Sequence, residues 1–140
     1  IQETKVFTIN MVSSKIYKQA HQTSARYPQE ISEFQQCGLE EEYSNNFKAP
    51  YVKQSPLQIG LELKEVVDIT HNNTHMVIAE IKEFHVNKNA LQPDGYINIE
   101  SLDAVCVSGL DHYHSTKSIA RLNYAKPDEQ VYSIPIEGES

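Results

Sequence analysis

Apolar and polar side chains alternate most clearly between residues 56 and 86, and this pattern predicts one long β-hairpin. From Leu57 to Leu63 every second side chain is Leu or Ile, which is the period of a strand with one buried face. Residues 70–74 are polar and have the composition of a turn. On the return strand the apolar positions change face between Ile81 and Phe84, which indicates a bulge or a sheet that curls toward a barrel.

Shorter patterns precede the hairpin. Residues 5–12 alternate as a further strand, and two short helices are predicted after it, at residues 15–20 and 28–37. Residues 47–56 carry two prolines and are expected to cross to the hairpin as an extended connector. The residues expected to bound the helices are Ser13 and Ser14 before the first, Pro28 in the first turn of the second, and Gly38 at its C-terminal end.

After the hairpin the pattern weakens. Asn98 is expected to cap a single helical turn over residues 99–103, and residues 105–107 are predicted to form a short buried strand. Residues 110–126 show little periodicity, and residues 128–140 have the composition of a surface tail. The whole pattern predicts a mainly β, α+β domain over residues 1–127, with two short helices inserted between strands.

Composition narrows the range of partners. The chain has 140 residues, 39% of them hydrophobic, and a net charge of −7, so it lacks the basic surface that nucleic acid or an anionic membrane requires. No apolar run reaches membrane-spanning length and no signal-peptide pattern opens the chain, which favours a cytoplasmic protein. Cys37 and Cys106 are accordingly expected to be free, buried thiols.

Motifs of the common enzyme classes are absent from the chain. It has no nucleophile elbow, phosphate loop, Cys-x-x-Cys pair or dinucleotide fingerprint. The pairs His71/His75 and His112/His114 have spacings that a metal ion could use. Both pairs fall in expected loops with no cysteine close by, so the pattern favours ordinary loop residues over zinc ligands.

Two ring side chains are better candidates for a ligand site. His85 ends an otherwise apolar strand, where it is either a structural strand end or a neutral donor or acceptor for a ligand oxygen. Tyr113 is the centre of three consecutive ring side chains that follow Gly109, and three such rings suit a stacking surface for a planar ligand.

An ordered set of short segments resembles the flavin reductase-like family of FMN-binding split-barrel proteins. The segments are Phe7-Thr8-Ile9-Asn10-Met11-Val12, Thr23-Ser24, Tyr27-Pro28, Glu33-Phe34, Gly38-Leu39, Glu83-Phe84-His85-Val86, Leu102-Asp103-Ala104-Val105, Ser108-Gly109-Leu110-Asp111-His112-Tyr113-His114, and Ile119 to Pro127. The likeness covers nearly all of residues 1–127 and implies a Greek-key split β-barrel. The family's first strands come before the strand at residues 5–12, so the chain is expected to be truncated at its N-terminus.

The resemblance implies a homodimeric flavoprotein that binds FMN and transfers hydride from NADH or NADPH to flavin. It implies that His85 and Tyr113 contact the flavin, and that Ser24 and Arg26, in the loop after the first helix, serve the cofactor or the nicotinamide. Two alternatives stay open, a non-enzymatic FMN-binding electron carrier and a split-barrel module used only for ligand binding or dimerisation. The absence of an acid–base dyad is compatible with flavin chemistry, because the flavin ring itself carries the hydride.

Overall fold

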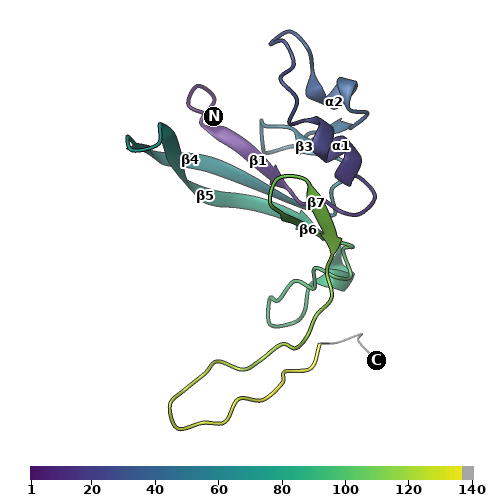
Figure 1. The fold of residues 1–140 in the computed structure, drawn as a ribbon, viewed down its shortest axis with the longest axis vertical. Helices are drawn as coiled ribbons and strands as arrows, with labels where there is room; N and C mark the ends of the chain where they lie inside the picture. The colour runs from purple at the N-terminus through teal and green to yellow at the C-terminus, as the bar shows by residue number, and fades with distance from the viewer. Residues whose placement is uncertain (137–140) are drawn as a thin grey trace.

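The computed structural model describes residues 1–136 and is mostly β with two short helices, as the sequence predicts. Its elements are β1 (Val6–Asn10), α1 (Tyr17–Gln22), α2 (Glu33–Gln36), β2 (Glu41–Glu42), β3 (Tyr51–Val52), β4 (Leu57–Ile69), β5 (Thr74–Val86), a 3-10 turn at Lys88–Ala90, β6 (Val105–Ser108) and β7 (His112–Ser115). Within these residues the strands form three open sheets, β1-β4-β5, β2-β3 and β6-β7. Figure 1 shows the helices at one end of the three-stranded sheet and the C-terminal segment leading away from the body.

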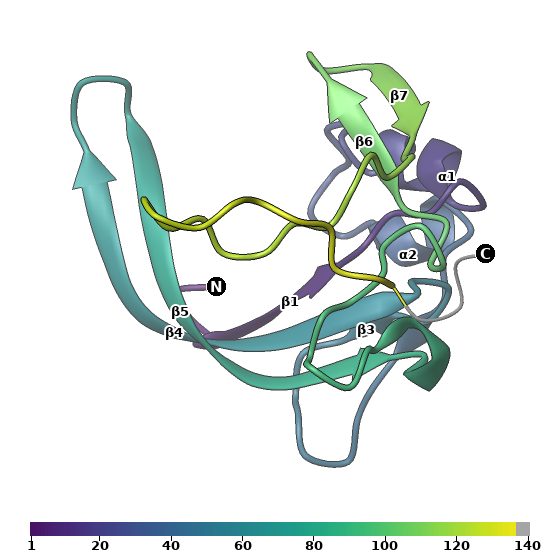
Figure 2. The same ribbon diagram turned by 90° about the horizontal axis from the view of Figure 1, so that it is seen from below.

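The long hairpin is confirmed. β4 and β5 pair antiparallel along most of their length, and β1 adds to the other edge of β4. In the turn, Asn73 has a φ of 54°, a conformation that asparagine tolerates, and the Asn72 side chain accepts a hydrogen bond from the Thr74 amide. Figure 2 shows how strongly the hairpin bends along its length.

The predicted bulge lies where the apolar positions change face. Gly60 pairs with Glu83 and the next residue, Leu61, pairs with Ile81, so Lys82 is left without a cross-strand partner. A second shift of register lies between Leu63 and Glu65. These irregularities curve the sheet, but within residues 1–136 it stays open and does not close into a barrel.

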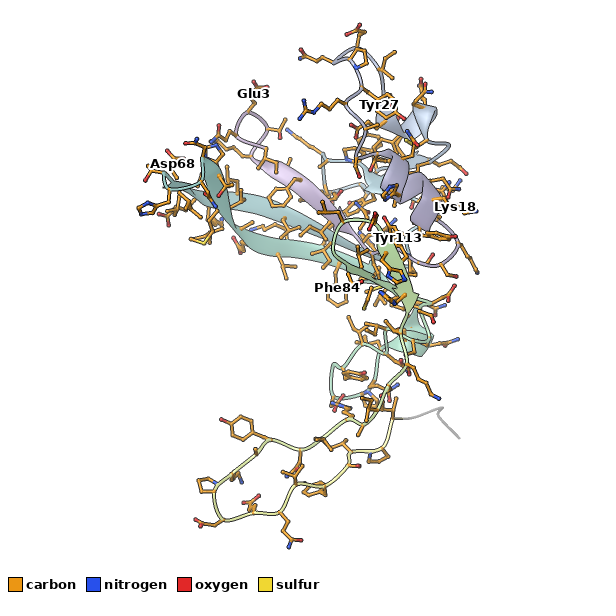
Figure 3. The ribbon with its side chains drawn as sticks, viewed as in Figure 1. Glu3, Lys18, Tyr27, Asp68, Phe84 and Tyr113 are labelled. Atoms are coloured by element: carbon orange, nitrogen blue, oxygen red, sulfur yellow. The ribbon has the colours of Figure 1, made fainter. Side chains whose placement is uncertain are left out.

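The two faces of the three-stranded sheet differ in chemistry, since neighbouring residues on a strand point to opposite faces. The apolar rungs are Ile9–Ile59–Phe84 and Phe7–Leu61–Ile81, and the polar rungs are Asn10–Gln58–His85 and Thr8–Gly60–Glu83. Phe47 and Tyr51 cover the polar face at Gly60. On the apolar face Phe84 and Ile81 remain 51% and 60% exposed, and Figure 3 shows Phe84 projecting from β5.

The first helix forms, but the predicted N-cap is wrong. α1 begins two residues later than expected, and its N-cap is Ile16, with no side-chain capping bond. Ser13 is buried and forms a backbone bridge with Ala104, and the Ser14 hydroxyl donates to the Asp103 carboxylate. The two serines therefore join the chain start to the segment before β6 instead of capping the helix.

The second helix is shorter than predicted, because Pro28 lies outside it and α2 begins at Glu33. Its C-terminal end is as expected. Gly38 has a φ of 68°, its amide donates to the Gln35 carbonyl at 3.3 Å, and the Leu39 amide donates to the Phe34 carbonyl at 2.8 Å. This pair of bonds is the Schellman motif, which favours glycine. Leu39 then joins a small core made by Ile16, Cys37 and Leu39, with Val12, Tyr27, Phe34 and Val52 packed against it.

The C-terminal part contains one predicted strand and one that the pattern missed. Asn98 accepts bonds from the amides of Glu100 and Ser101, as expected for a capped turn. β6 covers the predicted strand, but it is not buried: Val107 is 49% exposed and Cys106 is an exposed free thiol, whereas Cys37 is free and buried as predicted. β6 and β7 form a two-stranded sheet of their own.

Residues 116–136 form an extended arm that leaves the body and folds back on itself (Figure 1). The Asn123 amide donates to the Tyr132 carbonyl at 3.0 Å, and the Ile134 amide donates to the Arg121 carbonyl at 2.7 Å. Several apolar side chains of the arm stand free of the body, including Ile119 at 101% exposure. Across residues 1–136 no helix has both the length and the apolar composition needed to cross a membrane. The last part of the predicted tail, residues 137–140, lies outside the described residues.

Candidate functional site

Tyr113 of β7 packs against α1 and forms the first of two ring-lined hollows. Its ring centroid lies 5.3 Å from that of Tyr17 and 5.7 Å from that of His21. The Tyr113 hydroxyl and His21 Nδ1 are 3.1 Å apart, within hydrogen-bond distance. With Lys18 and Asp111 these residues line a hollow of about 220 Å³, which we call the ring site. Figure 3 shows Tyr113 and Lys18 on the same flank of the molecule.

The three consecutive rings at this point do not form one stacking surface. Because β7 is a strand, Tyr113 points to the opposite face from His112 and His114. The two imidazoles lie against each other, with centroids 4.2 Å apart, and His114 Nε2 is 2.8 Å from the Ser108 hydroxyl. Only Tyr113 therefore faces α1. Within residues 1–136 no three His, Cys, Asp or Glu side chains converge as ligands for a metal ion.

Ser24 and Arg26 lie in the loop that follows α1. The Ser24 hydroxyl donates to the His21 carbonyl at 2.8 Å, so Ser24 is attached to the helix end that carries the ring site. Arg26 is exposed two residues further along. Neither residue lines the hollow of the ring site itself.

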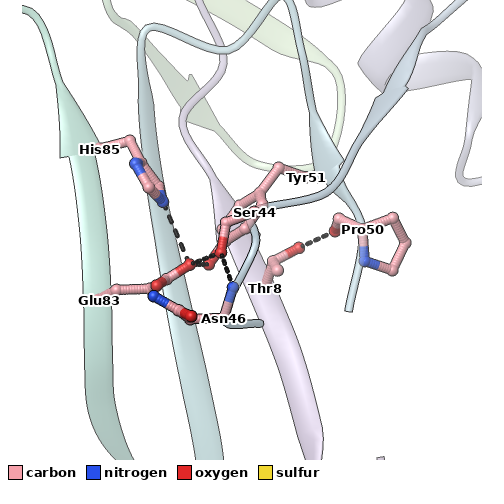
Figure 4. A network of polar contacts seen from close by, with 7 residues as sticks. All are labelled: Thr8, Ser44, Asn46, Pro50, Tyr51, Glu83 and His85. Carbon is pink, nitrogen blue, oxygen red and sulfur yellow. Dashed lines mark hydrogen bonds and ion pairs between the residues drawn. The ribbon is translucent and has the colours of Figure 1, made fainter. Parts of the chain in front are cut away.

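His85 belongs to a different cluster, on the polar face of the sheet (Figure 4). Glu83 Oε1 accepts hydrogen bonds there from the Ser44 hydroxyl at 2.6 Å and the Tyr51 hydroxyl at 2.8 Å, and His85 Nε2 lies 3.2 Å from the same oxygen. His85 and Glu83 share this face because they are two residues apart on β5. We call these four residues the Glu83 network.

Gly60 makes the Glu83 network possible. A Cβ atom at this position would overlap the Tyr51 hydroxyl oxygen and would lie 3.1 Å from Glu83 Cγ. Only a glycine in β4 lets Tyr51, which is 1% exposed, lie flat across the strand and reach Glu83.

Hydrogen bonding sets the charge states in this network. Bonds from Ser44 and Tyr51, and the weaker contact with His85, lower the pKa of Glu83 below its ordinary value. Burial, reinforced by the bond to Glu83, raises the pKa of Tyr51 well above its ordinary value. Glu83 is therefore an anion and Tyr51 a neutral donor at neutral pH.

The structure does not bring His85 and Tyr113 into one hollow. His85 lines a second hollow of about 250 Å³, the His85 hollow, together with Glu42, Tyr43, Ser44, Tyr51 and Gln58. In Figure 2, β7 lies apart from the end of β5 that carries His85. Of the four predicted site residues, His85 lines one hollow and Tyr113 the other, Ser24 bonds to the helix end beside the ring site, and Arg26 lines neither hollow.

Sequence reasoning missed Glu83, Tyr51 and Ser44. Two signals pointed to them: a lone glycine, Gly60, inside an alternating strand marks a close approach by another group, and Glu83 is two residues from His85 on one strand. A third hollow of about 540 Å³, mostly apolar and lined by β1 residues, Phe34 and residues 48–50, contains none of the predicted site residues.

Solved structures with the same fold define the class. One match is a protein from Shewanella frigidimarina NCIMB 400 that has a split barrel domain and to which flavin reductase activity is ascribed. Its structure matches with a TM-score of 0.85 at 47% sequence identity, and the match covers 87% of this chain and 62% of the Shewanella chain. The flavoredoxin of Desulfovibrio vulgaris (Miyazaki F) matches with a TM-score of 0.72 at 25% identity, over 91% of this chain and 66% of its own. The fold is therefore that of a split barrel, as predicted.

The family follows from the sequence itself. Residues 1–108 match the model of the flavin reductase like domain, so the chain belongs to that family. A protein of Aquifex aeolicus (strain VF5) is 27% identical over 111 residues, which are 79% of this chain and 56% of the relative. The chain therefore spans between 56% and 66% of the length of these three relatives. Family membership connects the chain with flavin chemistry.

Proposed function

We propose that this protein binds FMN and transfers hydride from NADH or NADPH to flavin. One observation carries the proposal: the likeness to the Shewanella protein extends over 87% of the chain at 47% identity, with a TM-score of 0.85. Flavin reductase activity is ascribed to that protein, which has a split barrel domain. The match to the flavin reductase like domain over residues 1–108 supports the same chemistry independently.

The side chains of the ring site support this proposal. A flavin offers a flat ring to aromatic side chains, and Tyr113 and Tyr17 supply rings at one hollow. Its phosphate needs cations and hydroxyl donors, and Lys18 lines the same hollow while Ser24 and Arg26 follow on the next loop. We therefore assign Tyr113, Ser24 and Arg26 to cofactor binding. FMN, when bound, supplies the hydride chemistry, while these residues bind and orient it.

His85 is proposed as a further cofactor contact from the polar face of the sheet. His85 and Tyr113 line different hollows of one chain, and we propose that a second copy of the chain brings them to one ligand. The proposed protein is therefore a homodimer. This assembly is supported by exposed apolar side chains, both on the arm and at Phe84 and Ile81 of the sheet, because large exposed apolar areas mark interaction surfaces.

The proposed location is the cytoplasm, where reduced nicotinamides are available and free thiols persist. Cys37 and Cys106 are both free, and neither has a disulfide partner within the described residues. This supports a reducing compartment.

The likeness to a flavoredoxin favours a second candidate function, that of an FMN-binding electron carrier. Such a protein would bind FMN and accept electrons from a protein donor, with no oxidation of NAD(P)H. Two measurements separate the candidates. FMN uptake without NAD(P)H oxidation indicates the carrier, and FMN uptake with oxidation of NADH or NADPH in the presence of free flavin indicates the reductase. A folded protein that takes up no FMN contradicts both.

A further inference from the structure

His85 is held from two sides by the Glu83 network. Its Nε2 atom lies 3.2 Å from Glu83 Oε1, and its ring meets the edge of the Tyr51 ring at a centroid distance of 5.2 Å and an angle of 80°. Tyr51 donates a hydrogen bond to Glu83 and is 1% exposed, so its ring is held in place against the imidazole. The ring of His85 is thus ordered although nearly half of its side-chain surface is open.

The chemistry of the contact determines which nitrogen carries the proton. An ionised carboxylate only accepts hydrogen bonds, and a neutral imidazole has one N–H donor and one acceptor nitrogen. Ser44 and Tyr51 already donate to Glu83, and their bonds keep the carboxylate ionised. When the imidazole of His85 is neutral, the nitrogen that faces Glu83 must therefore bear the proton, and Nδ1 keeps its lone pair.

We propose that Glu83 is a positioning residue: it fixes His85 in the Nε2–H tautomer, so that Nδ1 accepts a hydrogen bond from an N–H or O–H group of the bound flavin. The inference rests on the proposed flavin binding and narrows the role of His85 within it. A ring N–H or a ribityl hydroxyl is a suitable donor, and a phosphate oxygen is not. The charges agree, because Glu42 lines the hollow and Glu83 borders it, and two carboxylates repel a phosphate.

Nitrogen-15 NMR of the imidazole rings tests the positioning step without any ligand. With imidazoles neutral, His85 is expected as a single Nε2–H tautomer, assigned by the loss of its signals in His85→Gln. Glu83→Ala is expected to relax His85 to a mixture of tautomers, and Glu83→Gln, which keeps an acceptor oxygen, is expected to restore most of the preference. A His85 signal from the Nδ1–H tautomer in the unaltered protein overturns the proposal, whether or not the variants fold.

Glu80→Ala is the matched control. Glu80 lies on the same strand and pairs with Lys64 and Lys82, so its loss removes one carboxylate from β5 without touching His85. The control is expected to leave the His85 tautomer unchanged. A shift of the same size in Glu80→Ala would mean that His85 responds to charge in general, which contradicts a specific role of Glu83.

FMN titration followed by flavin fluorescence tests the second step. Glu83→Ala is expected to raise Kd roughly fivefold, the effect of one hydrogen bond, with Glu83→Gln near the unaltered protein and Glu80→Ala unchanged. A relaxed tautomer with an unaltered Kd would overturn the contact between Nδ1 and the ligand. If the unaltered protein takes up no FMN, the proposed function fails, while the NMR comparison still decides whether Glu83 positions His85.

Discussion

At the scale of single residues, Gly60 is the position on which the Glu83 network depends most. Gly60→Ala places a methyl group against the Tyr51 hydroxyl and 3.2 Å from Phe47 Cε1. We expect Tyr51 to be pushed off Glu83, at a cost of about 1–3 kcal/mol in the free energy of unfolding. Chemical denaturation measures the cost.

A double-mutant cycle isolates the clash that this prediction invokes. Tyr51→Phe removes the hydroxyl that a Cβ at Gly60 would meet, so Gly60→Ala should cost less in that background than in the unaltered chain. Equal costs in the two backgrounds would show that Tyr51 is not what forbids a side chain at Gly60.

The lowered pKa of Glu83 predicts a dependence of stability on pH. A carboxylate whose pKa is lower in the folded protein than in the unfolded chain stabilises the fold above the unfolded pKa, and this contribution is lost as pH falls through the folded pKa. The stability advantage over Glu83→Gln should therefore be present at neutral pH and should shrink once pH falls below the ordinary glutamate value of 4.5. Denaturation of both proteins between neutral pH and about pH 3 measures it. A difference that stays constant over this range would contradict the lowered pKa.

Tyr113 tests the ring site. If its ring packs on the flavin, Tyr113→Ala should weaken FMN binding by about 1 kcal/mol, or roughly fivefold in Kd, as measured by titration. Met76→Ala is the control, since Met76 is 47% exposed near the start of β5 and lines neither the ring site nor the His85 hollow. Equal affinities for the unaltered protein and Tyr113→Ala would remove Tyr113 from the site.

The sequence marks single residues of unusual type, but it does not show which partners they meet. His85 and Tyr113 are conspicuous because one ends an otherwise apolar strand and the other is the centre of three consecutive rings, and their contacts with flavin stay predictions. The role of Glu83 depends on Ser44 and Tyr51, which lie 39 and 32 residues away along the chain. No local pattern encodes such a convergence, because the bulged register and the loop that covers Gly60 create it together.

At the scale of elements, the end of α2 depends on one glycine. Gly38 has a φ of 68° and completes the Schellman bonds that turn the chain into the small core. Gly38→Ala is expected to cost about 1 kcal/mol of unfolding free energy, because a side chain is disfavoured in the left-handed region. Gln36→Ala, one residue inside the helix, is the control and should cost less. A Gly38→Ala protein as stable as the unaltered one would contradict this account of the helix end.

Elements with strong periodicity were predicted well and those held by distant contacts were not. The hairpin is recognisable in the sequence because one buried face imposes a period of two along β4, and the change of face on β5 marks its bulge. The strand β7 was not predicted, because its polar ring side chains give no alternation of apolar and polar positions. The predicted N-cap of α1 was wrong for another reason. Ser13 and Ser14 form tertiary contacts with Ala104 and Asp103, and these contacts replace the local capping bonds.

At the scale of the whole molecule, the arm is where we expect a second copy of the chain to dock. Several of its apolar side chains are unpacked in a single chain, with Ile119 fully exposed, although Ile136 at the end of the arm is buried. Ile119→Asp together with Leu122→Asp is therefore expected to shift a homodimer toward monomer in light scattering coupled to size-exclusion chromatography. Ile31→Asp, an exposed apolar residue between the helices, is the control. An unaltered molar mass in the arm variant would exclude the arm from the interface.

Flavin binding is the claim on which the proposed function, the dimer and the roles of His85 and Tyr113 all depend. The most direct measurement is a titration of the purified protein, expressed from its complete coding sequence, with FMN while the flavin absorption bands are recorded. We predict saturable uptake of one FMN per chain, with a shift of the flavin bands on binding. Spectra that remain the sum of free FMN and protein at every ratio would contradict the account.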